Sequence, residues 1–465
     1  MEKIGYKWCQ FVICGIALAW TACGGGPDST TIPYDSQGLP GNWESTFIAH
    51  VDEIGSTLPF VRARQSTDKK VHIAWYNAAA EQGGAEYHQL HHLVWNPSTD
   101  DTSRNVVANR PAPTGVLGFD RCDQFDMALD GNTPILIYPT YEINDVLQQV
   151  EADIMVNVNE GGVWQEAMGS VGFVDRNPVY QDGHITENMA VKIDRQGDIH
   201  YCYQYFTEGM DSANYRYPDL YYVHRDRSTL SDPIAGIEQY AQLEELVDGN
   251  AFSSYGTHNS VGYHNQLLLD GQDLPIIAYA EHGEDFMGTF ALKVAKKDVN
   301  GRWHLQTVDA LPDGWEIGGI GMAFYPEDPE RPEEPRSLGI AYAVRLPDPE
   351  PDNGHRLLFA SNQSGEWKTE VVDESTWCGT HCSLAFTQNG QPAIAYLDEQ
   401  SHSGRIHRFL KYAEFNGLRW NHESAEEYGD VGQYNTLWFD DKGIPHICTF
   451  SAEDNEILVV RRSNS

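Results

Sequence analysis

The sequence predicts an all-β protein, a seven-bladed β-propeller whose last blade is closed by the N-terminal strand. Three observations lead to this prediction. An apolar strand motif ending in an aromatic residue recurs along the chain, turn signals containing Gly precede most copies, and an unpaired strand pattern stands at each end. A repeat of roughly 50 to 75 residues made only of strands is typical of propeller blades.

The recurring motif is apolar almost throughout, as expected for a strand buried on both faces, and it predicts the second strand of each blade. The copies are 71–75, 134–138, 199–203, 275–279, 338–342, 392–396 and 445–449. The residue before the terminal aromatic is mostly small, which predicts close packing between blades. Cys202 and Cys448 hold this position, so we interpret them as small buried side chains rather than redox centres.

The other strands of each blade are predicted from what flanks the motif. A first strand ends in an Asp-Gly or similar turn, as in 127–131 and 267–271, which supplies the positive φ of a tight hairpin. A third strand follows the motif, as in 220–225 and 290–296. A fourth strand opens on a tryptophan, and these residues are Trp164, Trp303, Trp367 and Trp420.

The two chain ends predict how the ring closes. After the last motif only one strand pattern remains, at 457–462, while 42–51 is an isolated fourth-strand pattern that contains Trp43. We therefore expect the N-terminal strand to complete the last blade, because this pairing removes an open sheet edge. The predicted propeller domain covers 41–465.

The N-terminal segment predicts export. Lys3 and Lys7 precede a short apolar run from Phe11 to Trp20, and a small-residue cleavage site then leads into Cys23, a pattern typical of a signal peptide over 1–22. The segment resembles a bacterial lipoprotein signal, which implies lipid attachment at Cys23 and a flexible tether over 23–40. Trp20 departs from the aliphatic residue usual in that family, so ordinary signal cleavage is the alternative. The expected location is the outer membrane, the cell surface or the periplasm.

The charge balance narrows the choice of partners. The chain carries 31 Lys and Arg against 68 Asp and Glu, a formal charge of −37. Such a surface repels nucleic acid and anionic lipid, so we expect membrane contact only through the lipid anchor, and a monomer. The carboxylates could form a solubilising shell or bind cations, of which calcium is possible. No other cofactor is predicted.

Two cysteines lie close together at Cys378 and Cys382. In an oxidising compartment this spacing favours a small disulfide loop. A metal site is the alternative, but the segment lacks a second ligand pair at zinc spacing, so no metal site is predicted.

The repeat pattern over about 42–462 resembles bacterial seven-bladed propellers of the sialidase-like, BNR-repeat-like group, which implies the same fold. The Asp-box turns of true sialidases and a clear arginine triad are missing, which disfavours sialidase activity. Loops at one face of a propeller surround a central funnel where ligands bind. The catalytic candidates there are Tyr255, His258 and His264, and the ligand-binding candidates are Arg121, His184, Trp315, Trp377 and His381.

Each of these candidates has a structural alternative. Loop histidines often cap turns or contact neighbouring blades, and His381 could simply belong to the cysteine loop. Trp315 and Trp377 could cover blade ends.

The expected function is binding of a glycan or a protein at the cell envelope. Glycan-active enzymes, either polysaccharide lyases or glycoside hydrolases, and a scaffold subunit are the alternatives. A histidine and a tyrosine beside one sugar ring could serve as base and acid in lyase chemistry. The sequence leaves open whether the protein is an enzyme.

Overall fold

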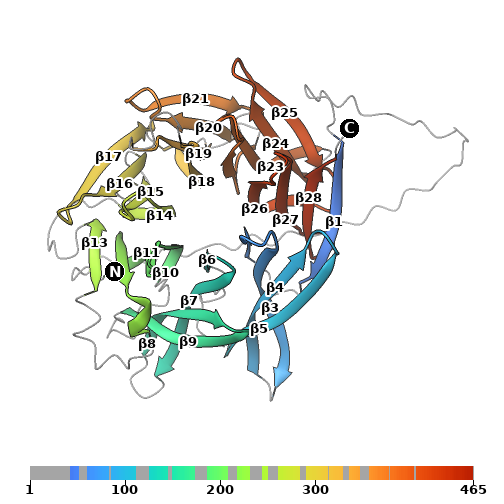
Figure 1. The fold of residues 1–465 in the computed structure, drawn as a ribbon. Helices are drawn as coiled ribbons and strands as arrows, with labels where there is room; N and C mark the ends of the chain where they lie inside the picture. Colours follow the sequence, from blue (N-terminus) through green and yellow to red (C-terminus); the bar gives the residue numbers. More distant parts are fainter. Residues whose placement is uncertain are drawn as a thin grey trace, which may run out of the picture. The chain divides into compact units, whose positions relative to one another are not determined.

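The computed structural model describes residues 42–51, 60–82, 85–111, 125–144, 149–172, 186–207, 217–230, 243–249, 260–282, 290–312, 314–327, 335–345, 355–375, 377–402 and 405–463. These residues form seven antiparallel sheets of four strands, which are the blades of a β-propeller (Figure 1). The predicted fold class is confirmed. No helix of the described residues has the length and apolar character needed to cross a membrane.

The first four blades follow one another along the chain. Blade 1 consists of β2 (Val61–Gln65), β3 (Val71–Gln82), β4 (Ala85–Asn96) and β5 (Asp101–Pro111). Blade 2 consists of β6 (Asp126–Asp130), β7 (Thr133–Asn144), β8 (Gln149–Glu160) and β9 (Val163–Gly172). Blade 3 consists of β10 (Thr186–Ile193), β11 (Ile199–Thr207), β12 (Tyr217–Arg225) and β13 (Glu244–Asp248), with the 3-10 helix η1 (Arg227–Thr229) after β12. Blade 4 consists of β14 (Ser260–Leu269), β15 (Pro275–His282), β16 (Ala291–Lys297) and β17 (Trp303–Ala310).

The last three blades include the closing strand. Blade 5 consists of β18 (Glu316–Phe324), β19 (Leu338–Arg345), β20 (Arg356–Ser361) and β21 (Lys368–Asp373). Blade 6 consists of β22 (Ser383–Phe386), β23 (Pro392–His402), β24 (Arg405–Phe415) and β25 (Trp420–Glu426). Blade 7 consists of β26 (Val431–Phe439), β27 (Pro445–Ser451), β28 (Glu456–Arg462) and the N-terminal strand β1 (Trp43–His50), which pairs antiparallel with β28. The predicted closure by the N-terminal strand is therefore confirmed.

The seven predicted motifs all form the second strand of a blade. The small positions one residue before the terminal aromatic are fully buried, and they are Ala74, Ile137, Cys202, Ala278, Ala341, Ala395 and Cys448. These strands supply much of seven apolar clusters, and each cluster lies between two neighbouring blades. Because every cluster belongs to two sheets, each blade is stabilised by its neighbours on both sides.

The inner strands form the ring around the propeller axis. Contacts run from β2 to β6, β10, β14, β18, β22 and β26, and β26 contacts β2 again. The ring is therefore closed at its innermost layer as well as by the pairing of β1 with β28 (Figure 1).

The structure corrects the predicted Cys378–Cys382 disulfide, because both residues are buried free thiols. The Cys378 thiol donates to the carbonyls of His355 and Asp373 at 3.6 and 3.5 Å, while the Cys382 thiol donates to the Ala341 carbonyl at 3.6 Å. The intervening residues turn the backbone so that the two thiols face different neighbours. Burial raises the pKa of both thiols, to about 12 for Cys382.

Candidate active site in the central channel

The channel at the centre of the propeller is lined by the inner strands, and their pairing with the second strands defines equivalent levels. The second level contains the residues opposite the small buried positions, and they are Arg62, Asp126, Ala190, Gln266, Gly321, Ser383 and Thr436. The first level lies two residues earlier and contains Phe60, Asn188, His264, Gly319, His381 and Tyr434. The third level lies two residues later and includes Arg64 and Lys192.

The first level is built on irregular backbone. Asn188, His264, His381 and Tyr434 have φ between 53° and 57°, a region that non-glycine residues rarely adopt. In β10, β14 and β26 the strand pairing shifts register at this residue, which marks a β-bulge. Bulges redirect side chains and are frequent beside functional sites, and the same holds for strained non-glycine residues.

A short local motif precedes the positive-φ residues of blades 4, 6 and 7. Gly262, Gly379 and Gly432 have φ of 94°, 100° and 104° and stand two residues before His264, His381 and Tyr434. A β-carbon on Gly432 would lie 2.7 Å from the carbonyl oxygen of Phe409, so this position requires glycine for space as well as for conformation.

Asparagines in blades 4 and 7 hold the bulges in place. Asn435 Nδ2 donates to the carbonyl of Gly432 at 2.8 Å and to that of His381 in the neighbouring blade at 3.1 Å. Asn265 does the same in blade 4, toward Gly262 at 3.0 Å and Asn188 of blade 3 at 2.5 Å. These bonds link the first-level residues of adjacent blades.

The first level brings a histidine and a tyrosine together. The rings of His381 and Tyr434 meet edge to face with centroids 4.8 Å apart, and Phe60 packs on the same tyrosine ring at 5.0 Å. Burial, together with smaller effects of the neighbouring His264 and Arg62, lowers the pKa of His381 to about 4. Burial also lowers the pKa of His264 to about 4. Both imidazoles are therefore neutral at neutral pH and can accept a proton.

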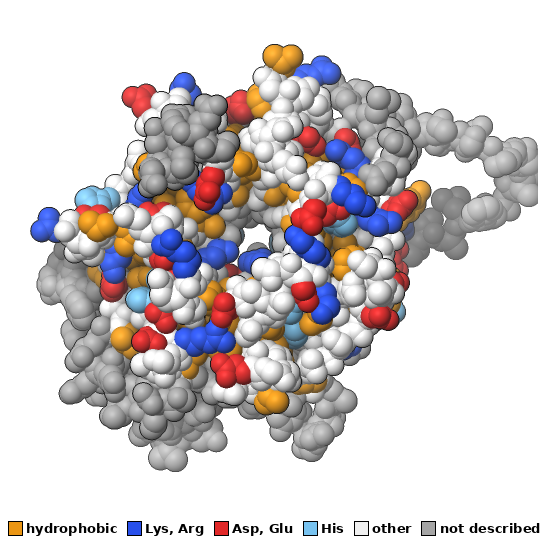
Figure 2. Space-filling model, in the orientation of Figure 1, with side chains coloured by type: hydrophobic (Ala, Val, Ile, Leu, Met, Phe, Trp, Pro, Cys, Tyr) orange, Lys and Arg blue, Asp and Glu red, His pale blue; other side chains and the backbone are white. Residues whose placement is uncertain are grey.

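The second and third levels carry a cationic cluster made of Arg62, Arg64 and Lys192 around Asp126. Asp126 Oδ1 lies 3.4 Å from Arg62 Nε and 2.9 Å from Arg64 Nη2, while Oδ2 accepts a bond from the Val191 amide at 2.9 Å. Burial lowers the pKa of Lys192 to about 8 and that of Arg62 to about 10. Figure 2 shows Lys and Arg side chains beside the central opening.

These four residues carry three basic groups against one carboxylate, on a chain whose net charge is −37. A channel with this local charge attracts anions, and its interior suits a carboxylate or sulfate group on a ligand. Neutral imidazoles and a phenol near such a group can also transfer protons.

The structure places only part of the predicted site. Arg121, His184, Tyr255 and His258 lie outside the described residues. His264 and His381 both lie in the channel, and His264 belongs to β14 rather than to the predicted loop. The alternative that His381 only forms part of a disulfide loop is wrong, because Cys378 and Cys382 are free thiols.

The two predicted tryptophans contact blade residues. Trp315 packs against the apolar cluster between blades 4 and 5, with Arg356 over its ring at 5.5 Å. Trp377 packs on the His355 ring at 5.0 Å. These contacts agree with the alternative interpretation, in which Trp315 and Trp377 cover blade ends. Contact of either tryptophan with a ligand stays a prediction.

Sequence reasoning missed Tyr434, Arg62, Arg64, Asp126 and Lys192. One signal for the tyrosine was present: within the described residues, the pattern Gly, any residue, His or Tyr, then Asn or Cys recurs at 262–265, 379–382 and 432–435. Aligning these three segments would have placed Tyr434 beside the two histidines. The charged residues have no such signal, because each occurs once at its level.

The geometry defines this chain as a seven-bladed β-propeller with a cationic, histidine- and tyrosine-containing channel. Comparison with known proteins finds no matching family model and no matching curated protein. An ulvan lyase, described as a new family of polysaccharide lyase, matches at 8% identity with a TM-score of 0.50, covering 91% of this chain and 95% of the lyase.

Two other solved structures are more distant. An α-L-arabinofuranosidase from Fusarium graminearum matches at 8% identity and TM-score 0.44, covering 90% of this chain and 98% of that enzyme. A Trypanosoma rangeli sialidase mutant matches at 10% identity and TM-score 0.36, covering 92% and 58%. At these identities the comparisons establish the fold alone.

Proposed function

We propose that the central channel binds an acidic polysaccharide and cleaves it by β-elimination at a uronic acid residue. The observation that carries this proposal is the neutral His381 beside Tyr434 in the same channel as Arg62, Arg64 and Lys192. The similarity to an ulvan lyase supports it only by showing that this fold accommodates lyase chemistry.

The proposed reaction requires three groups. The basic residues bind the uronate carboxylate, which lowers the cost of negative charge that develops when the C5 proton leaves. Neutral His381 takes this proton, the C4–O4 bond breaks, and a C4–C5 double bond forms. The Tyr434 hydroxyl protonates the departing O4, so no water, oxidant or reductant is consumed.

The test is to incubate the purified protein with a panel of uronic-acid polysaccharides and follow the ultraviolet absorbance of the new double bond. We expect absorbance to grow with the native protein. Tyr434→Phe keeps the ring packing but removes the hydroxyl, and His381→Gln removes the base. Each variant should lower kcat by about 100-fold or more, the size usual for loss of a general acid or base.

Matched controls use exposed side chains that belong to none of the three channel levels. Tyr428 is 83% exposed, so Tyr428→Phe should leave the rate unchanged, and His407→Gln changes another exposed residue. Full activity in Tyr434→Phe and His381→Gln would contradict the assigned roles.

Binding without catalysis is the second candidate function, because the net positive cluster of Arg62, Arg64 and Lys192 around Asp126 can hold an anionic ligand without any proton transfer. The same polysaccharides are therefore tested for binding, with and without calcium. Saturable binding with no absorbance change identifies a glycan-binding module and excludes the lyase. If the protein neither binds nor cleaves these polysaccharides, both functions are rejected and the scaffold role is the remaining hypothesis.

We also propose that the chain is exported and lipidated at Cys23, which rests on the N-terminal sequence alone. Cys23→Ala should abolish labelling by radioactive palmitate and release the protein from the membrane fraction. Membrane retention and labelling in this variant would refute the proposal.

A further inference from the structure

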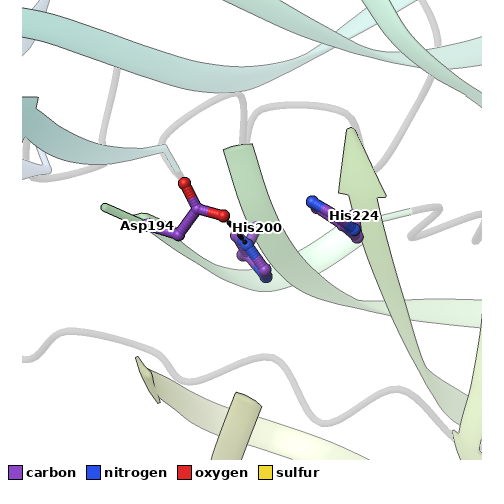
Figure 3. Close-up of side chains that lie close together, drawn as sticks. All are labelled: Asp194, His200 and His224. Atoms are coloured by element: carbon purple, nitrogen blue, oxygen red, sulfur yellow. Dashed lines mark hydrogen bonds and ion pairs between the residues drawn. The ribbon is translucent and has the colours of Figure 1, made fainter. Parts of the chain in front are cut away.

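Blade 3 brings two histidines and an aspartate together at the end of β10 and along β11 and β12. Asp194 Oδ2 lies 3.2 Å from His200 Nε2, and one ligand atom each from Asp194, His200 and His224 lie within 4.8 Å of one another (Figure 3). Asp198 Oδ2 lies 3.6 Å from His224 Nε2. No other group of this kind occurs in the described part of the chain.

In Asp194, Asp198 and His200 the atom that points away from the cluster is already bonded, and the other atom faces the cluster. Asp194 Oδ1 accepts bonds from the amides of Gln196 and Asp198, at 2.9 and 2.8 Å. Asp198 Oδ1 accepts a bond from the Arg227 amide at 3.1 Å. His200 Nδ1 lies 2.6 Å from the Tyr222 hydroxyl. This is the arrangement of metal ligands, whose outer hydrogen bonds fix the tautomer and the orientation of the donor atom.

Other blades have the same turn as Asp194–Asp198, but a different residue lies beside it on the third strand. The cluster is therefore specific to blade 3 and is not a repeated feature of the fold. The residue opposite His200 is His224, whereas the equivalent pairs are Ile276 opposite Lys296 in blade 4 and His446 opposite Arg461 in blade 7. In blade 4 the ammonium of Lys296 lies 3.8 Å from Asp270, the counterpart of Asp194. Blade 3 replaces this built-in cation with a second imidazole.

We propose that Asp194, His200 and His224, completed by Asp198, bind one divalent transition-metal ion of the zinc type as a structural site. Zinc takes four nitrogen and oxygen ligands at about 2.0–2.1 Å, so its ligand atoms are spaced about 3.3 Å apart. The separations of 3.2 and 3.6 Å agree with this spacing.

Binding requires local movement of His224 and of Asp198, which is not part of the preformed three-residue group. The rings of His200 and His224 are stacked, with centroids 4.3 Å apart and planes at 20°, and a metal ion must lie in the plane of each ring. The His224 side chain is 48% exposed and can rotate, while those of Asp194 and His200 are 6% and 5% exposed and are held in place. His200 and Asp194 therefore form the fixed half of the site, and His224 and Asp198 close over the ion.

The test begins with metal analysis of the full-length protein after dialysis against a chelator and re-equilibration with Zn²⁺. We expect one bound zinc per chain and a higher Tm with Zn²⁺ than with chelator. Co²⁺ in place of Zn²⁺ should give the visible absorption of a tetrahedral cobalt site. No stoichiometric zinc binding by the native protein overturns the proposal.

Two variants assign the ligands without replacing the buried Asp194 or His200. His224→Lys introduces the residue type of blade 4, so it should abolish zinc and the cobalt spectrum while keeping the Tm seen in chelator. Tyr222→Phe removes only the outer hydrogen bond and should weaken binding by about 10- to 100-fold.

The matched control is His304→Ala. This histidine is 64% exposed and lies 2.9 Å from Asp298 in a similar turn, but it has no second imidazole beside it. Zinc binding should be unchanged in this variant. Equal binding by the native protein and His224→Lys would show that the ion lies elsewhere, which contradicts the assignment.

Discussion

Four residues of the first channel level, Asn188, His264, His381 and Tyr434, hold a backbone conformation that costs energy. Strained positions of this kind cost about 1–3 kcal/mol each and persist only where surrounding contacts fix them. In blades 4, 6 and 7 a glycine two residues earlier allows the backbone to turn. In blades 4 and 7 the asparagine that follows the strained residue donates a hydrogen bond to the carbonyl of that glycine. The strain directs His264, His381 and Tyr434 to one place, which is the basis of the proposed chemistry.

Gly432→Ala should lower the free energy of unfolding by about 2 kcal/mol or more, because the new β-carbon would lie 2.7 Å from the Phe409 carbonyl at a φ of 104°. Gly443→Ala is the control, since its φ is 75° but nothing lies within 4 Å. It should cost only about 1 kcal/mol, from backbone strain alone. Denaturant titration measures both, and equal losses would rule out the steric contribution.

The pH dependence of the proposed cleavage follows from two groups in the channel. The pKa of His381 is about 4, so kcat/KM should rise as pH increases through 4 to 5 and the ring becomes neutral. The pKa of Lys192 is about 8, so binding of an anionic substrate should weaken above this pH as its charge is lost. Lys192→Arg should remove the alkaline limb and keep the acidic one. An unchanged alkaline limb would exclude Lys192 as its source.

At the scale of strands, a tyrosine within the second strand joins neighbouring blades. Tyr279, Tyr342 and Tyr396 are fully buried, and each donates its hydroxyl to an aspartate at the end of the preceding blade. The acceptors are Asp248 at 2.5 Å, Asp309 at 2.5 Å and Asp373 at 2.6 Å. The terminal aromatic of the repeated motif is thus both a core residue, as predicted, and a polar link between sheets.

Tyr342→Phe should destabilise the protein by about 1.5–3 kcal/mol, because it removes a hydrogen bond to a carboxylate while keeping the ring. Combining it with Asp309→Asn in a double-mutant cycle isolates the pair. We expect a coupling energy of about 1 kcal/mol or more, measured by chemical denaturation. If the two changes in unfolding free energy are strictly additive, the bond does not stabilise the interface between blades 4 and 5.

At the scale of the whole propeller, buried histidines make stability depend on pH. Burial lowers the pKa of His72 to about 4 and those of His92 and His282 to about 3, and all three are buried. The unfolded chain binds protons at these groups near pH 6.5, while the folded chain does not until about pH 4. Stability from these groups is therefore present above pH 6.5 and is lost as pH falls toward 4.

The expected loss is about 1.4 kcal/mol per histidine for each pH unit in this window, or about 3–4 kcal/mol for three between pH 6 and 5. Most carboxylates titrate below this window, so they do not offset the effect. Guanidinium unfolding at pH 7.5, 6 and 5 measures it. A midpoint that stays constant down to pH 5 would contradict the role of burial.

The sequence alone determined the number of blades, the buried second strands and the closure by the N-terminal strand. It could do so because the strands and turns of each blade are encoded by residues that are close in sequence, in a pattern of apolar and turn residues that recurs along the chain. Those patterns also placed His264 and His381 among the candidates.

Only the tertiary structure decided which residues share the channel and the blade 3 cluster. Tyr434 meets Phe60 and His381 because blade 7 packs against blade 1 on one side and blade 6 on the other, a consequence of ring closure that no local pattern encodes. The same holds for Asp126 between Arg62 and Arg64, and for the thiols of Cys378 and Cys382, which face different neighbours although they are close in sequence. Strand patterns are set by contacts along the chain, whereas a site is set by contacts around the ring.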